Sequence, residues 1–160
     1  MDYKKTYLNF FSANNIALEN SVLLAVSGGI DSMSLLHLAI SCKQRIQVAH
    51  INYQLRGNDS DLDEKLVANY CKQKGVTAHI KKTTISSGNN IQLEARKIRY
   101  AFFKEVVKKE KLDYIITAHH QNDDQETFIL NIIRGSGLAG LKAIPFKRDN
   151  ILRPLLNFKK

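Results

Sequence analysis

The sequence predicts an open, mostly parallel α/β sheet of five strands with helices on both faces. Short apolar, β-branched runs alternate along the chain with longer segments whose apolar residues recur at helical spacing. An alternation of strand, crossover helix and strand implies parallel pairing with right-handed connections. The length of 160 residues, with 44% hydrophobic residues, suits one domain over residues 1–160 with a single core.

The first predicted elements are a covering helix and a buried strand. A helix is expected over residues 3–14, with three aromatic residues on its inner side: Tyr7, Phe10 and Phe11. The run 22–26 is apolar throughout, as in a strand buried on both faces, and helical spacing begins soon after it. A tight turn over residues 27–32 therefore joins a strand to a helix.

Two further strands are expected over residues 46–53 and 76–81, with a helix over 59–74 between them. This helix is predicted to turn the following residues inward: Leu62, Leu66, Val67 and Tyr70. A polar loop at 83–90 leads to a long helix over 91–110. Its candidates for a buried side are Leu93, Ile98, Phe102, Val106 and Val107.

The last predicted elements are a strand over 114–118, a helix over 123–134 and a short edge strand over 151–153. Ligands of open parallel sheets bind at the carboxyl ends of the strands, near the point where the strand order reverses. The turn 27–32 and the stretch 119–124 each follow a predicted strand. We therefore expect the functional site at that edge of the sheet.

Composition favours a cytoplasmic protein with an anionic partner. Lys and Arg outnumber Asp and Glu by 24 to 15, which gives a formal charge of +9 and suits ATP, RNA or both. Cys42 and Cys71 are widely separated and form no C-x-x-C motif, so neither a zinc site nor a redox pair is expected. The chain has no apolar run long enough to span a bilayer and no signal-peptide core, so no membrane partner is expected.

The turn after the first strand has the features of a phosphate-binding loop. It lacks side chains at Gly28 and Gly29, so its backbone N–H groups can approach an anion at the positive end of the following helix. Ser27 and Ser32 add hydroxyl groups. The lysine of a Walker A loop and the dinucleotide G-x-G-x-x-G pattern are both missing. The structural alternative is a glycine-rich turn with Asp31 or Ser32 as a helix cap.

The turn resembles the S-G-G-x-D-S loop of the N-type ATP pyrophosphatases, the PP-loop superfamily, whose fold is Rossmann-like and of the adenine nucleotide α-hydrolase type. These enzymes cleave ATP between the α and β phosphates and leave an adenylylated intermediate. The resemblance implies ATP as substrate, Mg²⁺ as cofactor and a loop that holds the departing pyrophosphate. The ATP-binding residues it implies are Ser27, Gly28, Gly29, Ile30, Asp31 and Ser32.

A second block, H-I-N-Y-Q-L-R-G over residues 50–57 with S-D-L-D-E over 60–64, resembles the tRNA(Ile)-lysidine synthetase branch of this superfamily. The branch usually has a second histidine where this chain has Tyr53. Arg56 is a candidate for substrate binding, because a guanidinium pairs with phosphate or carboxylate in bidentate fashion. The alternative is an arginine that pairs with a nearby acid: Asp59, Asp61 or Asp63.

A third block, E-A-R-K-I-R-Y-A-F-F over residues 94–103, resembles the arginine helix of the same branch. Arg96 and Arg99 lie three residues apart, so they share a helix face and can reach one polyanion. The resemblance implies a catalytic role for Arg96 and substrate binding for Arg99. The structural alternative is a solvated basic face.

A fourth block, T-A-H-H-Q-N-D-D-Q-E-T over residues 117–127, holds the densest set of ionisable groups. We expect catalytic roles for His120, Asp123 and Glu126, with Mg²⁺ held by Asp31 and Asp123. Asp123 and Glu126 lie one helical turn apart, and the pair could instead hold the cationic end of lysine. Asp-x-x-Glu before an apolar run is also typical of a helix capping box. The branch generally has a second acid where this chain has Asn122.

The last matching segments are R-G-S-G-L-A-G-L, which begins at Arg134, and R-P-L-L over residues 153–156. Arg134 is a third candidate for substrate binding, and Asp31 joins the catalytic candidates named above. The resemblance implies ATP-dependent attachment of L-lysine to the wobble cytidine of the isoleucine tRNA with a CAU anticodon. The oligomeric state stays open, with a homodimer as one option.

The resemblance leaves two alternative functions. One is another adenylylating reaction of the superfamily, either tRNA thiolation or amidation. The other is an ATP-binding module without catalysis. Because relatives of the branch continue with tRNA-binding domains, we expect residues 1–160 to be a PP-loop domain truncated near its C-terminal end, which binds ATP but modifies tRNA poorly by itself.

Overall fold

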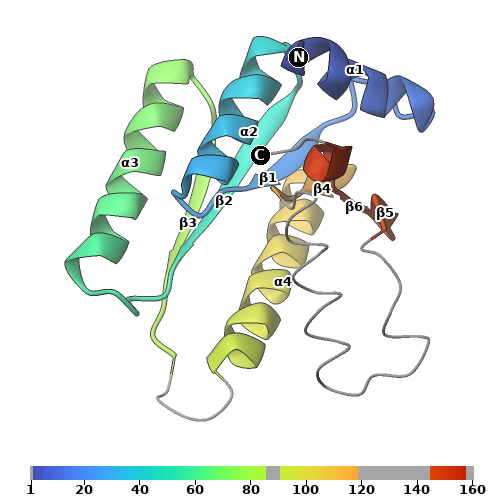
Figure 1. The fold of residues 1–160 in the computed structure, drawn as a ribbon. Coiled ribbons are helices and arrows are strands. Elements are labelled where there is room, and N and C mark those ends of the chain that lie inside the picture. The colour runs from blue at the N-terminus through green and yellow to red at the C-terminus, as the bar shows by residue number, and fades with distance from the viewer. Residues whose placement is uncertain (1, 86–90, 119–144, 158–160) are drawn as a thin grey trace, which may run out of the picture.

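A computed structural model describes residues 2–85, 91–118 and 145–157 (Figure 1). The strands are β1 (Val22–Ala25), β2 (Ile46–Asn52), β3 (Ala78–Lys82), β4 (Tyr114–Ile116), β5 (Lys147–Arg148) and β6 (Ile151–Leu152). The helices are α1 (Tyr3–Ala13), α2 (Ile30–Ser41), α3 (Asn58–Lys74), α4 (Ile91–Glu110) and the short 3-10 helix η2 (Pro154–Asn157).

The strands form one sheet in the order β3-β2-β1-β4-β6-β5, and every pair except β5 with β6 is parallel. The predicted open, mostly parallel α/β sheet is thus confirmed. Over the residues that the structure describes, it has six strands instead of the expected five, because Lys147 and Arg148 turn back to pair with β6. The order reverses between β1 and β4, since β2 and β3 extend the sheet on one side of β1 and β4 begins the other.

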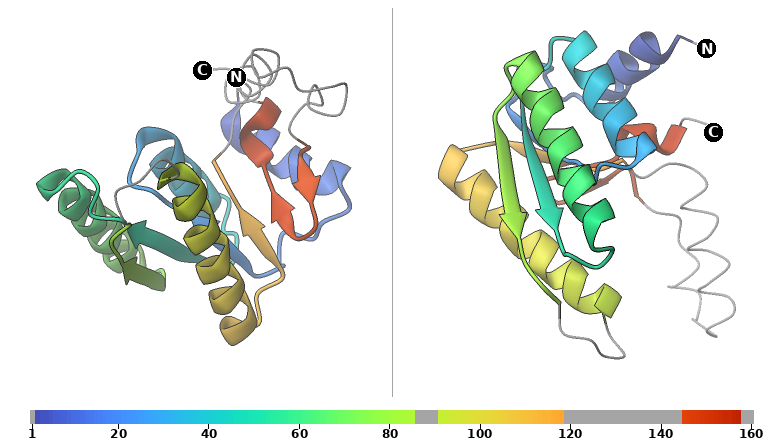
Figure 2. Two further views of the ribbon diagram at one scale, coloured as in Figure 1. Left: turned by 90° about the horizontal axis from the view of Figure 1, so that it is seen from below. Right: turned by 90° about the vertical axis from the view of Figure 1, so that its left-hand side faces the viewer.

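The sheet separates two apolar cores, and successive residues of β1 contribute to opposite ones. Val22 and Leu24 pack in the core formed with α1, α2 and α3, whereas Leu23 packs in the core formed with α4. Figure 2 shows the two layers of helices on either side of the sheet. All three side chains are fully buried, which is why β1 is a continuous apolar run instead of an alternating one.

Helix α1 packs at one end of the first core, as predicted, through Tyr7, Phe10 and Phe11. The Tyr7 hydroxyl donates a 2.6 Å hydrogen bond to Gln44 Oε1, which ties α1 to the loop after α2. Burial raises the pKa of Tyr7 far above its usual range, so the hydroxyl stays protonated and remains a donor. In the described residues, none of the helices is long and apolar enough to cross a membrane.

The predicted inward face of α3 was partly wrong. Leu62 and Leu66 are 61% and 49% exposed, whereas Ser60, Val67 and Cys71 are buried. These buried residues are seven and then four positions apart, so they form one narrow stripe along the helix. Leu62 and Leu66 lie outside this stripe. Leu93 near the start of α4 is also exposed, at 51%.

The starts of β1 and β4 are joined through Asp113. Its carboxylate accepts hydrogen bonds from the Ser21 backbone N–H at 2.8 Å and the Ser21 hydroxyl at 3.1 Å, and these bonds lower its pKa, the backbone N–H most. Because the folded-state pKa lies below the unfolded one, the stabilisation is complete above about pH 5 and is lost as the pH falls through the lowered pKa.

We therefore expect Asp113→Asn to lower the melting temperature at pH 7 and to lose that difference progressively below about pH 4. Thermal unfolding followed by circular dichroism across this pH range measures both. The exposed carboxylate Glu105, replaced by Gln, is the control and should show no such pH-dependent difference. A constant deficit of Asp113→Asn at every pH would contradict the assignment.

Candidate functional site

The turn between β1 and α2 lies at the carboxyl end of the central strand. Gly28 has a φ of +93°, a value that L-residues rarely adopt, and Gly29 is the N-cap of α2 with no side-chain cap bond. The first N–H groups of a helix have no acceptor within the helix itself, so the start of α2 is suited to an anion. The predicted geometry of an anion-binding corner is present in the backbone.

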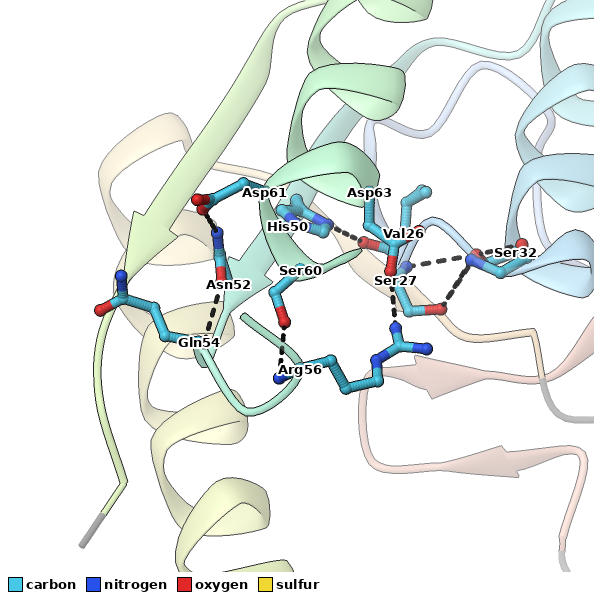
Figure 3. Close-up of polar contacts among 11 residues, drawn as sticks. Val26, Ser27, Ser32, His50, Asn52, Gln54, Arg56, Ser60, Asp61 and Asp63 are labelled. Atoms are coloured by element: carbon cyan, nitrogen blue, oxygen red, sulfur yellow. Dashed lines mark hydrogen bonds and ion pairs between the residues drawn. The ribbon is translucent and has the colours of Figure 1, made fainter. Parts of the chain in front are cut away.

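The two serines of this turn hold its shape. The Ser27 N–H donates to Ser32 Oγ at 3.2 Å, and Ser32 Oγ donates to the Gly29 carbonyl at 2.9 Å (Figure 3). The Gly29 N–H donates to Ser27 Oγ at 3.3 Å, and the two hydroxyl oxygens lie 3.2 Å apart. Ser32 is 6% exposed. The hydroxyls thus set the loop conformation before any ligand arrives.

A buried histidine fixes the strand end from which the turn starts. His50 of β2 is 2% exposed, and its Nδ1 lies 2.9 Å from the Val26 carbonyl oxygen. Since a carbonyl accepts, Nδ1 carries the proton and donates. The peptide unit between Val26 and Ser27 is therefore held on its carbonyl side by His50 and on its N–H side by Ser32. No role for His50 was predicted from the sequence.

A pocket of about 410 Å³ opens beside the turn, within the size range of small-molecule sites. It lies at the carboxyl ends of β1, β2 and β4, where the strand order reverses. The turn contributes Ser27, Gly29, Ile30, Asp31 and Ser32. The strand ends contribute Ala25, Val26, Ala49, Ile51, Thr117 and Ala118, and the three alanines among them leave space open. Tyr53, Arg99, Tyr100 and Phe103 complete the lining.

Arg99 enters the pocket from α4, and Tyr53 lies next to it. The Tyr53 hydroxyl donates to the Ala95 carbonyl at 3.0 Å, and Arg99 Nε lies 3.5 Å from the same hydroxyl. Arg96 lies outside the lining, with its guanidinium 5.3 Å from the centre of the Tyr100 ring. Of the two predicted arginines of this helix, Arg99 is thus the one that borders the cavity.

Arg56 forms an ion pair outside the pocket lining. Its Nη2 donates to Asp63 Oδ2 at 2.6 Å, which is one of the pairings the sequence left open. Asp63 itself packs on the turn: a Cβ added to Gly28 would lie 2.7 Å from Asp63 Cβ. The contact of Asp63 with the turn was not predicted from the sequence, where Asp63 was only a possible partner of Arg56.

A polar cluster holds the loop that carries Arg56. Asn52 Nδ2 donates to Asp61 at 2.8 Å and to Glu64 at 2.7 Å, and its Oδ1 accepts from the Gln54 N–H at 2.9 Å. Lys82 Nζ donates to Asp61 at 2.7 Å. The bonds from Lys82 and then Asn52 lower the pKa of Asp61, and Asp61 raises the pKa of Lys82. The end of β2 is therefore clamped to α3 and β3.

The remaining predicted site residues lie outside the described part of the chain: His120, Asp123, Glu126 and Arg134. Their assignments stay predictions, as does the metal pair of Asp31 with Asp123. Within residues 2–85, 91–118 and 145–157, no cluster of three His, Cys, Asp or Glu side chains could bind a metal by itself. Asp31 lines the pocket and supplies a carboxylate there that can act as a metal ligand.

The chain is similar to curated proteins named tRNA(Ile)-lysidine synthase. It is 40% identical to that of Chlorobaculum tepidum, covering 98% of this chain and 50% of the relative. It is 34% identical to that of Clostridium acetobutylicum, covering 96% of this chain and 36% of the relative. The chain thus spans half or less of the length of these relatives.

Solved structures share its fold at low identity. A U34-tRNA thiolase from Methanococcus maripaludis superposes with a TM-score of 0.74 at 17% identity, covering 99% of this chain and 60% of the other. An NH3-dependent NAD synthetase from Campylobacter jejuni gives 0.62 at 15%, covering 100% and 69%. The family model described as PP-loop domain matches residues 2–160. With a glycine corner, a helix start and a pocket at the sheet's switch point, the chain belongs to the PP-loop domain family.

Proposed function

We propose that this chain binds ATP, with the β and γ phosphates on the turn 27–32 and the nucleoside in the adjoining pocket. The observation that carries the proposal is that one continuous cavity is lined by the turn, by small residues at the strand ends and by Arg99. Backbone N–H groups and the start of α2 suit the phosphates. The small residues Ala25 and Ala49 leave room for a flat ring.

We propose that Mg²⁺ accompanies ATP. Mg²⁺ is commonly held by one or two carboxylates together with substrate phosphates and waters, and Asp31 in the pocket supplies one such carboxylate. Asp123 is the second ligand proposed from the sequence. The bound ion would neutralise part of the phosphate charge. Asp31 would then orient the phosphates relative to the turn.

For the whole protein we propose ATP-dependent joining of L-lysine to the wobble cytidine of the CAU-anticodon isoleucine tRNA. In the first step the O2 atom of cytosine bonds to the α phosphorus, and the bond to pyrophosphate breaks. In the second step the neutral amine of lysine bonds to C2 of the base, and AMP leaves with the former O2. Support comes from relatives with the name tRNA(Ile)-lysidine synthase.

Within this scheme the residues that the structure describes bind ATP and orient its phosphates. The N–H groups at the start of α2 would stabilise charge on the leaving pyrophosphate, because the turn that precedes them is fixed by Ser27, Ser32 and His50 before the reaction. Arg99, which borders the same pocket, would stabilise charge at the α phosphate. Catalytic roles of Arg96, His120, Asp123 and Glu126, and substrate binding by Arg134, complete the proposal.

Thiolation by a catalytic cysteine is less consistent with the structure than the joining of lysine. Burial raises the pKa values of Cys42 and Cys71, whereas a reactive thiol needs a lowered one. Neither residue lines the pocket, and both pack in the core on the α2–α3 side of the sheet. The two described thiols therefore have the properties of packing residues.

The turn is tested by Gly28→Ala. The added Cβ would contact Asp63 at 2.7 Å, and the φ of +93° would cost about 1 to 3 kcal/mol for an L-residue. We expect at least about tenfold weaker ATP binding in isothermal titration calorimetry. Gly75→Ala is the matched control: it has a φ of +65° but open space around the new Cβ, so ATP affinity should not change. Equal ATP affinity of Gly28→Ala and the unmodified chain would contradict the phosphate site.

The reaction is tested by exchange of labelled pyrophosphate into ATP. We expect exchange to require the CAU-anticodon isoleucine tRNA and not to require lysine, because the tRNA base is the group that is adenylylated. The control is the same tRNA with uridine at the wobble position, which should not support exchange. Exchange driven by lysine without tRNA would contradict the proposed order, and ATP binding without any exchange would favour an inert module.

A further inference from the structure

The carboxylate of Asp63 lies against the corner of the phosphate-binding turn. Asp63 belongs to α3, yet its Cβ, Cγ and Oδ1 lie 2.7, 2.9 and 3.0 Å from the position that a Cβ on Gly28 would take. A negative charge beside a site for pyrophosphate repels the ligand unless a cation offsets it. The placement of Asp63 therefore needs an explanation beyond packing.

The cation that offsets Asp63 is Arg56. Its guanidinium lies 2.6 Å from Asp63 Oδ2, and the side chains of Arg56 and Asp63 are 68% and 26% exposed. The backbone of Arg56 is held as well, since its N–H donates to the hydroxyl of the buried Ser60 at 3.1 Å. Figure 3 shows the Arg56 side chain extending from its loop toward Asp63 and Ser27.

A guanidinium has five N–H donors in a rigid fork, so one edge can remain on a carboxylate while another meets a phosphate oxygen. In the ion pair with Asp63, Arg56 uses Nη2. The exposed remainder of its fork can reach an anion at the corner without leaving Asp63. A lysine could not do both with fixed geometry.

We propose that Asp63 is a positioning residue that holds Arg56 beside Gly28, where Arg56 binds the pyrophosphate end of the nucleotide. This inference rests on the proposed ATP site and deepens it. It assigns to the turn a side-chain cation that the S-G-G-x-D-S sequence itself lacks. Through Asp63, α3 becomes part of the pyrophosphate site although it contributes no residue to the pocket lining.

The direction in which Asp63→Asn changes the affinity for pyrophosphate shows whether Asp63 positions Arg56 or only repels the ligand. Asp63→Asn keeps the side-chain shape but removes the charge that holds Arg56. If Asp63 positions Arg56, inorganic pyrophosphate should bind about tenfold more weakly. If Asp63 acts only as a nearby negative charge, pyrophosphate should bind more tightly. AMP, which lacks the outer phosphates, should bind equally well in both proteins.

Isothermal titration of pyrophosphate and AMP, each with Mg²⁺, tests four variants: Asp63→Asn, Arg56→Gln, their double substitution and Asp59→Asn. We expect the first two to weaken pyrophosphate binding alone, and the double variant to be no weaker than Arg56→Gln, because the residues act as one unit. Asp59→Asn, an exposed acid in the first turn of α3, should bind both ligands normally.

Unchanged or tighter pyrophosphate binding by Asp63→Asn would overturn the proposal, as would an equal loss of pyrophosphate and AMP, which would mark a purely structural role. Arg56→Gln gives an independent answer if Asp63→Asn unfolds, because normal pyrophosphate binding by Arg56→Gln also overturns it. If the unmodified chain binds neither ATP nor pyrophosphate, the proposed function fails and this inference fails with it. If the unmodified chain binds ATP normally and none of the variants changes pyrophosphate binding, only this inference fails and the proposed ATP site stands.

Discussion

The site depends on one peptide unit, the link between Val26 and Ser27. Its carbonyl accepts from buried His50 and its N–H donates to Ser32, so the strand ends and the turn begins at a fixed orientation. The left-handed conformation of Gly28 and the start of α2 at Ile30 follow from that point. Because these bonds are internal, the turn needs little rearrangement to receive an anion, which is the usual requirement for strong electrostatic binding in proteins.

The pocket follows from the same strands that form the cores. β1 and β2 are packed on both faces along most of their length, but toward their carboxyl ends the α4 side carries small residues at Ala25 and Ala49, followed in β2 by Ile51. Tyr53, just after β2, donates to the Ala95 carbonyl of α4. The cavity therefore lies between the small residues of the strand ends and the larger side chains of Tyr53, Arg99, Tyr100 and Phe103.

Strong local patterns were predictable from the sequence, and relations between distant residues were not. The bounds of α4, the buried run of β1 and the glycine turn each follow from a period or a residue type within one segment. The exposure of Leu62 and Leu66 depends on how α3 rests on the sheet, since several apolar stripes fit the same helix. The contact of Asp63 with Gly28 joins residues 35 positions apart, and no local pattern specifies it. His120 and the acids after it lie outside the described residues, so they remain sequence assignments.

The two outer strands of the described sheet are short or end in basic residues, and this affects how the molecules associate in solution. β5 has two residues, Lys147 and Arg148, and β3 ends in Lys81 and Lys82. Short outer strands that carry lysine or arginine resist pairing with a strand of another molecule, because such pairing brings like charges together. Basic residues here thus have a use apart from anionic ligands: they discourage edge-to-edge joining of the sheets of neighbouring molecules into larger aggregates.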